Sequence, residues 1–162
     1  METAVQKIMG RMKLRFRNKF PKKPTSKFKS KLEEDFNNFL IKQKIQFGYE
    51  DYKVSYLKPE KLSKYTPDFN CPAVDTFKII FETKGQFLTS DRKKHLLIKA
   101  QHPNLDIRFV FSNSKTKIGK KSKTTYAKWC ELKGFKYHCV YSTGKMLPDE
   151  WVKELHQQQK KL

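Results

Sequence analysis

The chain has 162 residues, of which 37% are hydrophobic and 14% aromatic, so it can form one folded domain and is too apolar for an intrinsically disordered protein. Its 36 lysine and arginine residues outnumber its 16 acidic residues, which gives a net charge of +20. Such a charge repels itself in a compact fold and therefore predicts a polyanionic partner, of which nucleic acid is the first candidate.

The cysteine pattern and the hydropathy of the sequence indicate in which cellular compartment the protein is expected. Cys71, Cys130 and Cys139 form no CxxC pair and are odd in number, which argues against a disulfide framework or a zinc cluster. No apolar run approaches the roughly 20 residues of a membrane helix, and the N-terminus lacks the apolar segment of a signal peptide. We therefore expect a soluble intracellular protein with no membrane partner.

Residues 1–30 are predicted to form a basic, flexible arm. Residues 1–31 contain eleven lysine or arginine residues and a single acid, Glu2, while Pro21 and Pro24 interrupt any helix. An arm of this kind suits sequence-independent contact with DNA phosphates. A solubilising tail would explain the same charge.

Helices and strands are expected to alternate after the arm. A helix begins near residue 31, with Ser30 as its N-cap and Glu33 three residues later, as in a capping box. Strands are expected at 47–57, 65–71 and 77–85, with a polar connector between the first two. The later elements are expected at 91–102 (helix, capped by Ser90), 106–112 (strand), 125–134 (helix), 135–141 (strand) and after Pro148 (short helix). This order predicts an α/β (α+β) domain over 31–155 with a mixed sheet, followed by a tail at 156–162.

One stretch of the expected hairpin at 65–85 has the residues of a metal site. Asp68 lies at the end of one strand, and Glu82-Thr83-Lys84 begins fourteen residues later. Strand alternation puts Glu82 and Lys84 on one face, and pairing of the two strands would bring Asp68 within about 5 Å of Glu82. Two carboxylates that close repel each other unless a cation joins them or one holds a proton. Hard oxygen ligands of this type favour magnesium or manganese over zinc.

These residue types suit phosphodiester hydrolysis. A divalent ion can activate water and neutralise charge, a second ion about 3.5–4 Å away can stabilise the leaving oxygen, and a lysine can stabilise the transition state. The pattern is nevertheless short, and in a lysine-rich chain an exposed Glu82–Lys84 ion pair worth about 0–1 kcal/mol is the simpler interpretation. Glu33 likewise has a simpler interpretation as part of the capping box.

Longer runs of sequence carry a far more specific resemblance. The segments that carry it are "FKSKLEEDF", "KIQFGYEDYKVSY", "YTPDF", "ETKG" and "SDRKKHLLIKAQHPNLDIRFVFSNSKTK". Together they resemble phage endonuclease I, a family of Holliday-junction-resolving enzymes, over roughly residues 28–155. The resemblance implies a restriction-endonuclease-like mixed β-sheet flanked by helices, in an intertwined (domain-swapped) homodimer. It also implies Mg²⁺-dependent nicking of both strands of branched DNA, and the host-cell cytoplasm as the compartment of a phage protein.

By position, the resemblance assigns Glu33, Asp68, Glu82 and Lys84 to the catalytic set, with two Mg²⁺ ions per site and Mn²⁺ as a substitute. Asp68, Glu82 and the backbone carbonyl of Thr83 would bind the shared ion, and Glu33 from the partner chain would reach the second. Lys84 would serve the nucleophile or the transition state. A bridge near 57–64 would join the two halves of the dimer. The N-terminal arm and the segment between Asp68 and Glu82 are longer than in the family.

Five further residues are candidate DNA contacts because they follow the hairpin or lie in a basic loop: Arg92, Lys93, His95, Lys115 and Lys117. A structural histidine and a solvated basic loop are the alternatives. Two other functions stay open at this point. A non-catalytic basic DNA-binding protein would explain the charge but not the carboxylates, and a restriction-like endonuclease would cut linear duplex DNA.

Overall fold

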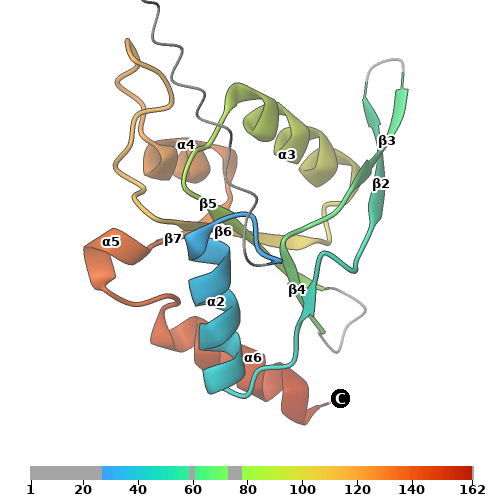
Figure 1. Ribbon diagram of the computed structural model, residues 1–162. Helices are drawn as coiled ribbons and strands as arrows, with labels where there is room; N and C mark the ends of the chain where they lie inside the picture. Colours follow the sequence, from blue (N-terminus) through green and yellow to red (C-terminus); the bar gives the residue numbers. More distant parts are fainter. Residues whose placement is uncertain (1–26, 59–60, 73–77, 162) are drawn as a thin grey trace, which may run out of the picture.

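A five-stranded mixed sheet forms the centre of the computed structural model, which describes residues 27–58, 61–72 and 78–161 (Figure 1). Its strands are β1 (Gly48–Tyr49), β4 (Phe69–Cys71), β5 (Ile79–Lys84), β6 (Asp106–Phe111) and β7 (Lys136–Cys139), in this spatial order. β5, β6 and β7 are parallel, whereas β1 and β4 pair in antiparallel fashion at one side. The expected mixed sheet is therefore confirmed.

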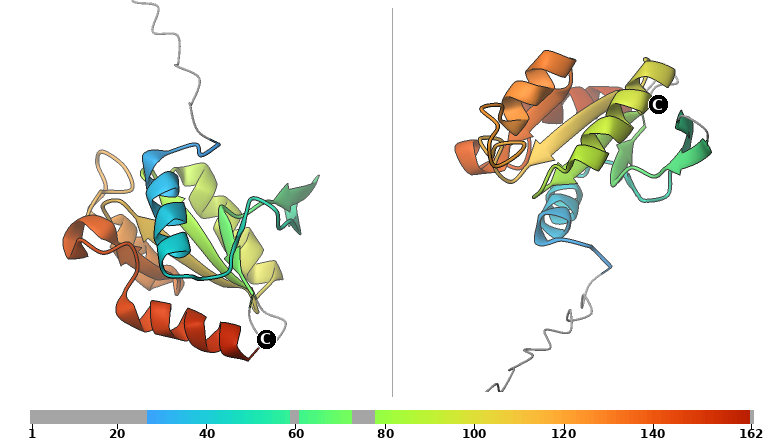
Figure 2. Two further views of the ribbon diagram at one scale, coloured as in Figure 1. Left: turned by 60° about the horizontal axis from the view of Figure 1, so that its bottom comes forward. Right: turned by 90° about the horizontal axis from the view of Figure 1, so that it is seen from above.

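Helices cover both faces of this sheet (Figure 2). Parallel neighbours need long crossover connections, and α3 (Thr89–Gln101) and α4 (Tyr126–Lys133) provide them between β5 and β6 and between β6 and β7. The opposite face carries α2 (Lys31–Lys42) and α6 (Asp149–Lys160), and the short α5 (Val140–Thr143) follows β7. Among the described residues, no helix is long and apolar enough to cross a membrane.

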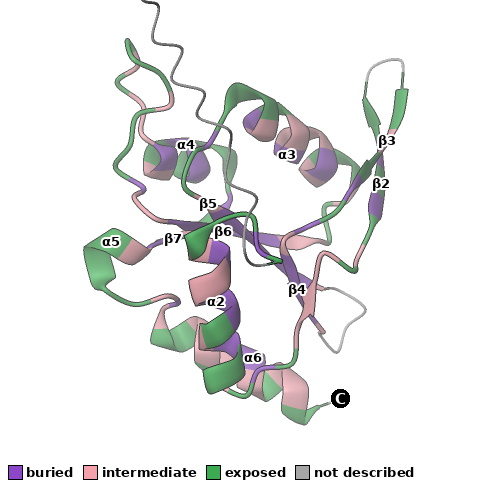
Figure 3. Cartoon of the chain, in the orientation of Figure 1, coloured by how far each residue is buried: buried purple, intermediate pink, exposed green. Residues whose placement is uncertain are grey.

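The sheet is buried on both faces, as Figure 3 shows for its central strands. Ile80 packs in a cluster with residues of α3 and α4, such as Ile98 and Trp129. Phe81, its neighbour on β5, packs on the other side with Phe36 of α2. Because side chains alternate along a strand, Glu82 shares the face of Ile80, which is the face that α3 covers.

A second, two-stranded sheet projects from the domain (Figure 1). It is a hairpin of β2 (Val54–Lys58) and β3 (Lys61–Tyr65), in register from Val54 opposite Tyr65 to Lys58 opposite Lys61. The polar connector expected here is thus largely a strand, because residues 61–65 gain their backbone partners from β2. Tyr65 is buried at the base of the hairpin, next to the main sheet.

Several boundaries differ from the sequence predictions, and the strand expected at 135–141 ends at Cys139 because α5 begins at Val140. The strand expected at 47–57 is divided into β1 and β2. Helix α3 begins earlier than expected, because the Asp91 carboxylate accepts the backbone N–H of Leu88, so Ser90 lies inside the helix. Helix α6 continues to Lys160 and includes most of the expected tail. Residues 1–26 of the expected arm and residues 73–77 of the long hairpin segment lie outside the described residues.

An ion pair between a buried guanidinium and a partly exposed carboxylate attaches α6 to the centre of the sheet. The Arg108 guanidinium on β6 is fully buried and donates two hydrogen bonds of 2.7 Å to the Glu154 carboxylate on α6. The same guanidinium donates to Asp106 and lies 5.0 Å from the ring centre of Trp151. Removing one partner of such a pair leaves the other partners without compensation.

We expect Arg108→Ala to lower the free energy of unfolding by about 3 kcal/mol, because it truncates a fully buried side chain that packs against Trp151 and removes the partner of the partly exposed Asp106 and Glu154. Urea denaturation of the variant measures this change. Lys128→Ala is the matched control, since it breaks an exposed pair with Glu131 and should cost no more than about 1 kcal/mol. Equal costs for the two variants would contradict the role of Arg108.

Candidate active site

The β4–β5 pairing places Asp68 beside Glu82. Phe69 lies opposite Phe81 in this antiparallel ladder, and Asp68 and Glu82 are the next residues on each strand. The Asp68 Oδ2 atom accepts the backbone N–H of Thr83 at 2.9 Å and its hydroxyl at 3.1 Å. The cross-strand proximity expected from the sequence is therefore present, and Thr83 fixes the orientation of Asp68.

Groups from three elements surround the Glu82 carboxylate, which is 1% exposed. The Tyr65 hydroxyl at the end of β3 donates a 2.5 Å hydrogen bond to Oε1. Lys84 Nζ lies 2.8 Å from Oε2, and His95 Nε2 on α3 lies 3.5 Å from the same oxygen. The position of Glu82 is thus set by the hairpin, by its own strand and by α3.

Lys84 connects the two carboxylates. Its ammonium nitrogen lies 2.8 Å from Glu82 and 3.9 Å from Asp68, and the side chain is 15% exposed. Burial by itself would lower the pKa of Lys84, but the charges of Glu82 and Asp68 outweigh burial and raise this pKa. Lys84 therefore carries its positive charge at neutral pH.

The two carboxylates differ in their affinity for protons. Burial would raise the pKa of Glu82, but Lys84 and His95 hold this pKa below its ordinary value. Burial and the charge of Glu82 raise the pKa of Asp68 to about 7, against the opposing effects of Lys84 and the Thr83 N–H. Glu82 is thus ionised, whereas Asp68 exchanges a proton near neutral pH.

Glu33 takes part in the cap of α2 and also lines a cavity. Ser30 Oγ accepts the Glu33 N–H at the start of α2, as a capping residue should. The Glu33 carboxylate in turn accepts the Lys29 N–H at 3.0 Å and the Tyr49 hydroxyl at 2.8 Å. The same carboxylate lines a cavity with Asp68, within a single chain.

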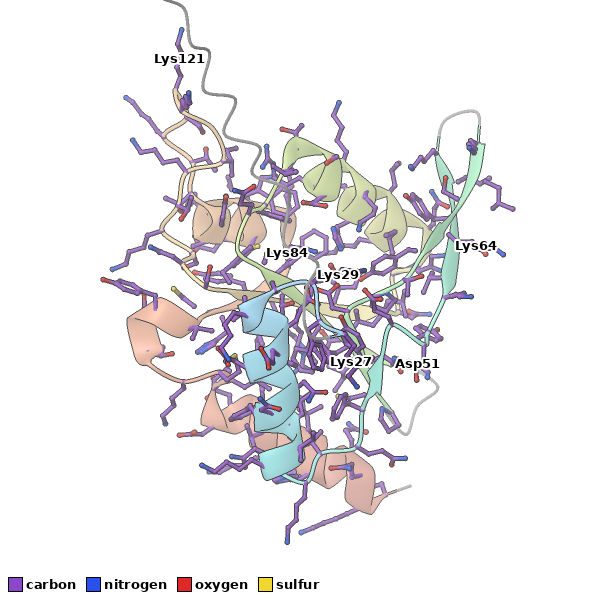
Figure 4. All side chains as sticks on the ribbon, viewed as in Figure 1. Lys27, Lys29, Asp51, Lys64, Lys84 and Lys121 are labelled. Atoms are coloured by element: carbon purple, nitrogen blue, oxygen red, sulfur yellow. The ribbon has the colours of Figure 1, made fainter. Side chains whose placement is uncertain are left out.

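This cavity has a volume of about 550 Å³ and contains four carboxylates and four lysines. Its lining residues are Lys29, Glu33, Glu50, Lys53, Thr66, Asp68, Glu82, Thr83, Lys84 and Lys94. Figure 4 shows two of them, Lys29 and Lys84, near the first turn of α2. The cavity is therefore strongly polar and lies where the hairpin, the main sheet, α2 and α3 meet.

Comparison with known proteins gives the family. The profile of phage endonuclease I matches residues 14–161. The chain is 46% identical to Endonuclease I of Escherichia phage T7 over 127 aligned residues. This alignment covers 78% of this chain and 79% of the relative. The chain is also 44% identical over 127 residues to Endodeoxyribonuclease 1 of Enterobacteria phage T3, covering 78% of each chain. The chain belongs to the phage endonuclease I family.

The donor set of this family member fits a hard divalent cation. Within residues 27–58, 61–72 and 78–161, no three histidine, cysteine or acidic side chains converge closely enough to hold an ion alone. Magnesium is, however, commonly held by one or two carboxylates together with water and substrate phosphates. Burial and the neighbouring charge of Glu82 raise the pKa of Asp68, and a divalent cation bound beside the two carboxylates would favour the ionised form.

Two of the expected DNA contacts are buried in the structure of this family member. Arg92 donates hydrogen bonds to the Phe87 carbonyl and to the Thr89 hydroxyl, so its guanidinium caps an internal turn. His95 is fully buried, with Nδ1 2.8 Å from the Asp91 carbonyl and Nε2 directed at Glu82. Both residues have structural contacts in place of the expected contacts with DNA.

The other three expected DNA contacts are exposed but lie outside the cavity. Lys93 points away from the sheet on α3, and Lys115 and Lys117 lie in the long loop between β6 and α4. Figure 4 labels Lys121 at the far end of this loop. Phosphate contact by these residues stays a prediction.

Sequence reasoning missed three lysines of the cavity and the tyrosine that hydrogen-bonds to Glu82. Tyr65 was assigned only to a strand, and Lys29, Lys53 and Lys94 were part of the general positive charge. The segments that carry the resemblance contain all four, but none of them belongs to a recognised motif. Their convergence depends on the docking of the hairpin and α3 against β5.

We expect Asp68→Asn to stabilise the protein at pH values above about 7 when no divalent cation is present. The wild-type side chain must ionise in the folded state with a pKa of about 7 but ionises with a pKa of 3.8 when unfolded, so its ionisation disfavours folding. The gain should be about 2–4 kcal/mol, decline as the pH falls, and vanish near pH 4. Asparagine keeps an oxygen for the hydrogen bonds from Thr83.

Urea denaturation of wild type and Asp68→Asn in EDTA, near pH 4 and above about pH 7, measures the difference in the free energy of unfolding. Added Mg²⁺ should narrow the difference at high pH, since a ligand that binds only the folded wild type stabilises it. A difference that is independent of pH would contradict the raised pKa of Asp68.

Proposed function

We propose that the chain is a DNA endonuclease that resolves four-way (Holliday) junctions and other branched DNA by divalent-metal-dependent phosphodiester hydrolysis. The observation that carries this proposal is the convergence of Asp68, Glu82 and Lys84 in one polar cavity. A net charge of +20 suits a DNA substrate. The names of the T7 and T3 relatives, Endonuclease I and Endodeoxyribonuclease 1, support the same class of activity.

The proposed roles follow from the contacts of each side chain. Asp68, Glu82 and the Thr83 carbonyl would hold one Mg²⁺ or Mn²⁺ ion, and Glu33 a second. When bound, the metal would supply an activated water and neutralise charge on the phosphate. Lys84 contributes a fixed positive charge beside the carboxylates, where it can orient the nucleophile or stabilise charge that develops on the phosphate. Tyr65 holds Glu82 in place for this task.

We further propose an intertwined homodimer that acts in the host-cell cytoplasm. The β2–β3 hairpin, which coincides with the bridge expected near 57–64, joins the segment that carries Glu33 to the segment that carries Asp68. If the hairpin opened and β2 paired with β3 of a second chain, Glu33 of the partner would take the place of the chain's own Glu33. Two symmetric sites would suit the paired cuts that a junction requires.

A restriction-like endonuclease that cuts linear duplex is the second candidate, because the same cavity could act on it. The deciding experiment compares cleavage of a labelled four-way junction with cleavage of its separate linear arms at equal protein and Mg²⁺ concentrations. Preferential cleavage of the junction supports the proposal. Equal or faster cleavage of the arms would contradict junction resolution and support the restriction-like endonuclease. A junction that is bound but not cut would support the non-catalytic DNA-binding protein.

Glu82→Ala should abolish Mg²⁺-dependent cleavage, with a loss of at least about 10²–10³-fold in rate, while junction binding in EDTA is retained. Glu34→Ala, on the first turn of α2 outside the cavity, is the control and should cleave like the wild type. A gel assay of cleavage and a mobility-shift assay of binding measure the two effects. Retained cleavage by Glu82→Ala would remove Glu82 from the mechanism.

Light scattering tests the dimer directly. The chain has a mass of 19.3 kDa, and the proposal predicts twice this value at the concentrations used for cleavage. A second readout uses a mixture of two inactive variants, Glu33→Ala and Glu82→Ala. An intertwined dimer that takes Glu33 from the partner should regain activity in a fraction of mixed dimers formed by refolding. A monomeric mass would contradict the shared site.

A further inference from the structure

The four lysines of the cavity differ in their partners. Lys84 is paired with Glu82 and Asp68, and Lys29 forms an ion pair with Glu50. Lys53 and Lys94 form no hydrogen bond or ion pair with any residue that the structure describes, although both line the same cavity. Two ammonium groups at the cavity are therefore free to bind an anion.

The two free lysines come from different elements. Lys53 directly precedes β2 and is exposed. Lys94 lies in the second turn of α3, between the exposed Lys93 and the buried His95. Its ammonium lies 5.1 Å from the ring centre of Tyr65, and the hydroxyl of this ring holds Glu82. Packing against Tyr65 therefore keeps Lys94 close to the carboxylates without pairing it with one.

The charges in the cavity explain why such groups are needed. A DNA strand that enters brings phosphates next to four carboxylates, which repel them. Lys29 is already paired with Glu50, and Lys84 is already paired with Glu82 and Asp68, the carboxylates that would hold the proposed cation. Lys53 and Lys94 are the cavity's remaining cations, and lysine binds phosphate as a point charge.

We propose that Lys53 and Lys94 form a two-lysine clamp for DNA phosphates next to the phosphate that is cleaved, and so position the strand over Asp68 and Glu82. This inference rests on the proposed nuclease function and adds substrate-positioning residues to it. Contacts with phosphates carry no base information, so the clamp acts equally on any DNA sequence. It also adds a residue of α3 to the expected DNA contacts: Lys94 lines the cavity, whereas Arg92 and Lys93 do not.

The salt dependence of DNA binding tests the clamp. Lys53→Gln, Lys94→Gln and the double variant are titrated with a fluorescein-labelled four-way junction in EDTA, from about 50 to about 200 mM salt. Each lost phosphate contact should reduce the slope of log K against log salt concentration by about 0.9, and the double variant should lose about 1.8. Lys94→Arg keeps the charge and should restore the wild-type slope.

Lys42→Gln is the matched control, because it removes the same charge from an exposed position at the other end of α2. It should keep the wild-type slope. Slopes of Lys53→Gln and Lys94→Gln equal to that of Lys42→Gln would overturn the clamp. Cleavage by wild type with Mg²⁺ is measured in parallel: wild-type cleavage with unchanged slopes refutes the clamp alone, whereas absence of cleavage refutes the nuclease function on which the clamp rests.

Discussion

Asp68 and Glu82 face each other at the end of the β4–β5 ladder, and this proximity of two carboxylates is the constraint that shapes the surrounding structure. Two largely buried negative charges at this separation are unfavourable unless a positive charge or a proton offsets them. In the structure, Lys84 supplies the positive charge, and Asp68 has an increased affinity for a proton. A divalent cation bound beside the two carboxylates would offset their repulsion in the same way and displace the proton from Asp68.

The rest of the fold holds this arrangement in place. The parallel strands β5, β6 and β7 form the base of the site, and the ion pair between the buried Arg108 and Glu154 attaches α6 to it. On the other face, α3 directs His95 at Glu82, and the hairpin contributes the hydroxyl of Tyr65. Elements far apart in the chain thus converge on one carboxylate, which would preorganise the proposed metal site.

The parts of the site that depend on local geometry could be predicted from the sequence. Alternation along a strand put Glu82 and Lys84 on one face, and the hairpin pairing put Asp68 opposite Glu82. The Ser30 cap of α2 also follows from local sequence. The positions of Tyr65 and His95 could not be predicted, because they depend on how the hairpin and α3 dock against β5.

Pairing and side-chain capping also explain the errors in the expected elements. The segment 61–65 has a polar sequence without apolar alternation and becomes a strand only by pairing with β2. Helix α3 begins near Leu88 because Asp91 accepts the Leu88 N–H, a contact that competes with the Ser90 cap. The terminal helix α6 extends beyond Leu155, where His156 Nε2 lies 2.8 Å from the Gln43 carbonyl. The first and last of these outcomes depend on contacts between segments, whereas the start of α3 depends on a local cap.

Binding of Mn²⁺ in the absence of DNA is the most direct test of the claim that Asp68 and Glu82 form a cation site. Electron paramagnetic resonance of free Mn²⁺ measures the affinity at a pH above 7, where Asp68 is ionised. The account predicts saturable binding by the wild type and an affinity at least about tenfold weaker for Asp68→Ala. Equal affinities for the two proteins, or no binding by the wild type, would contradict the account.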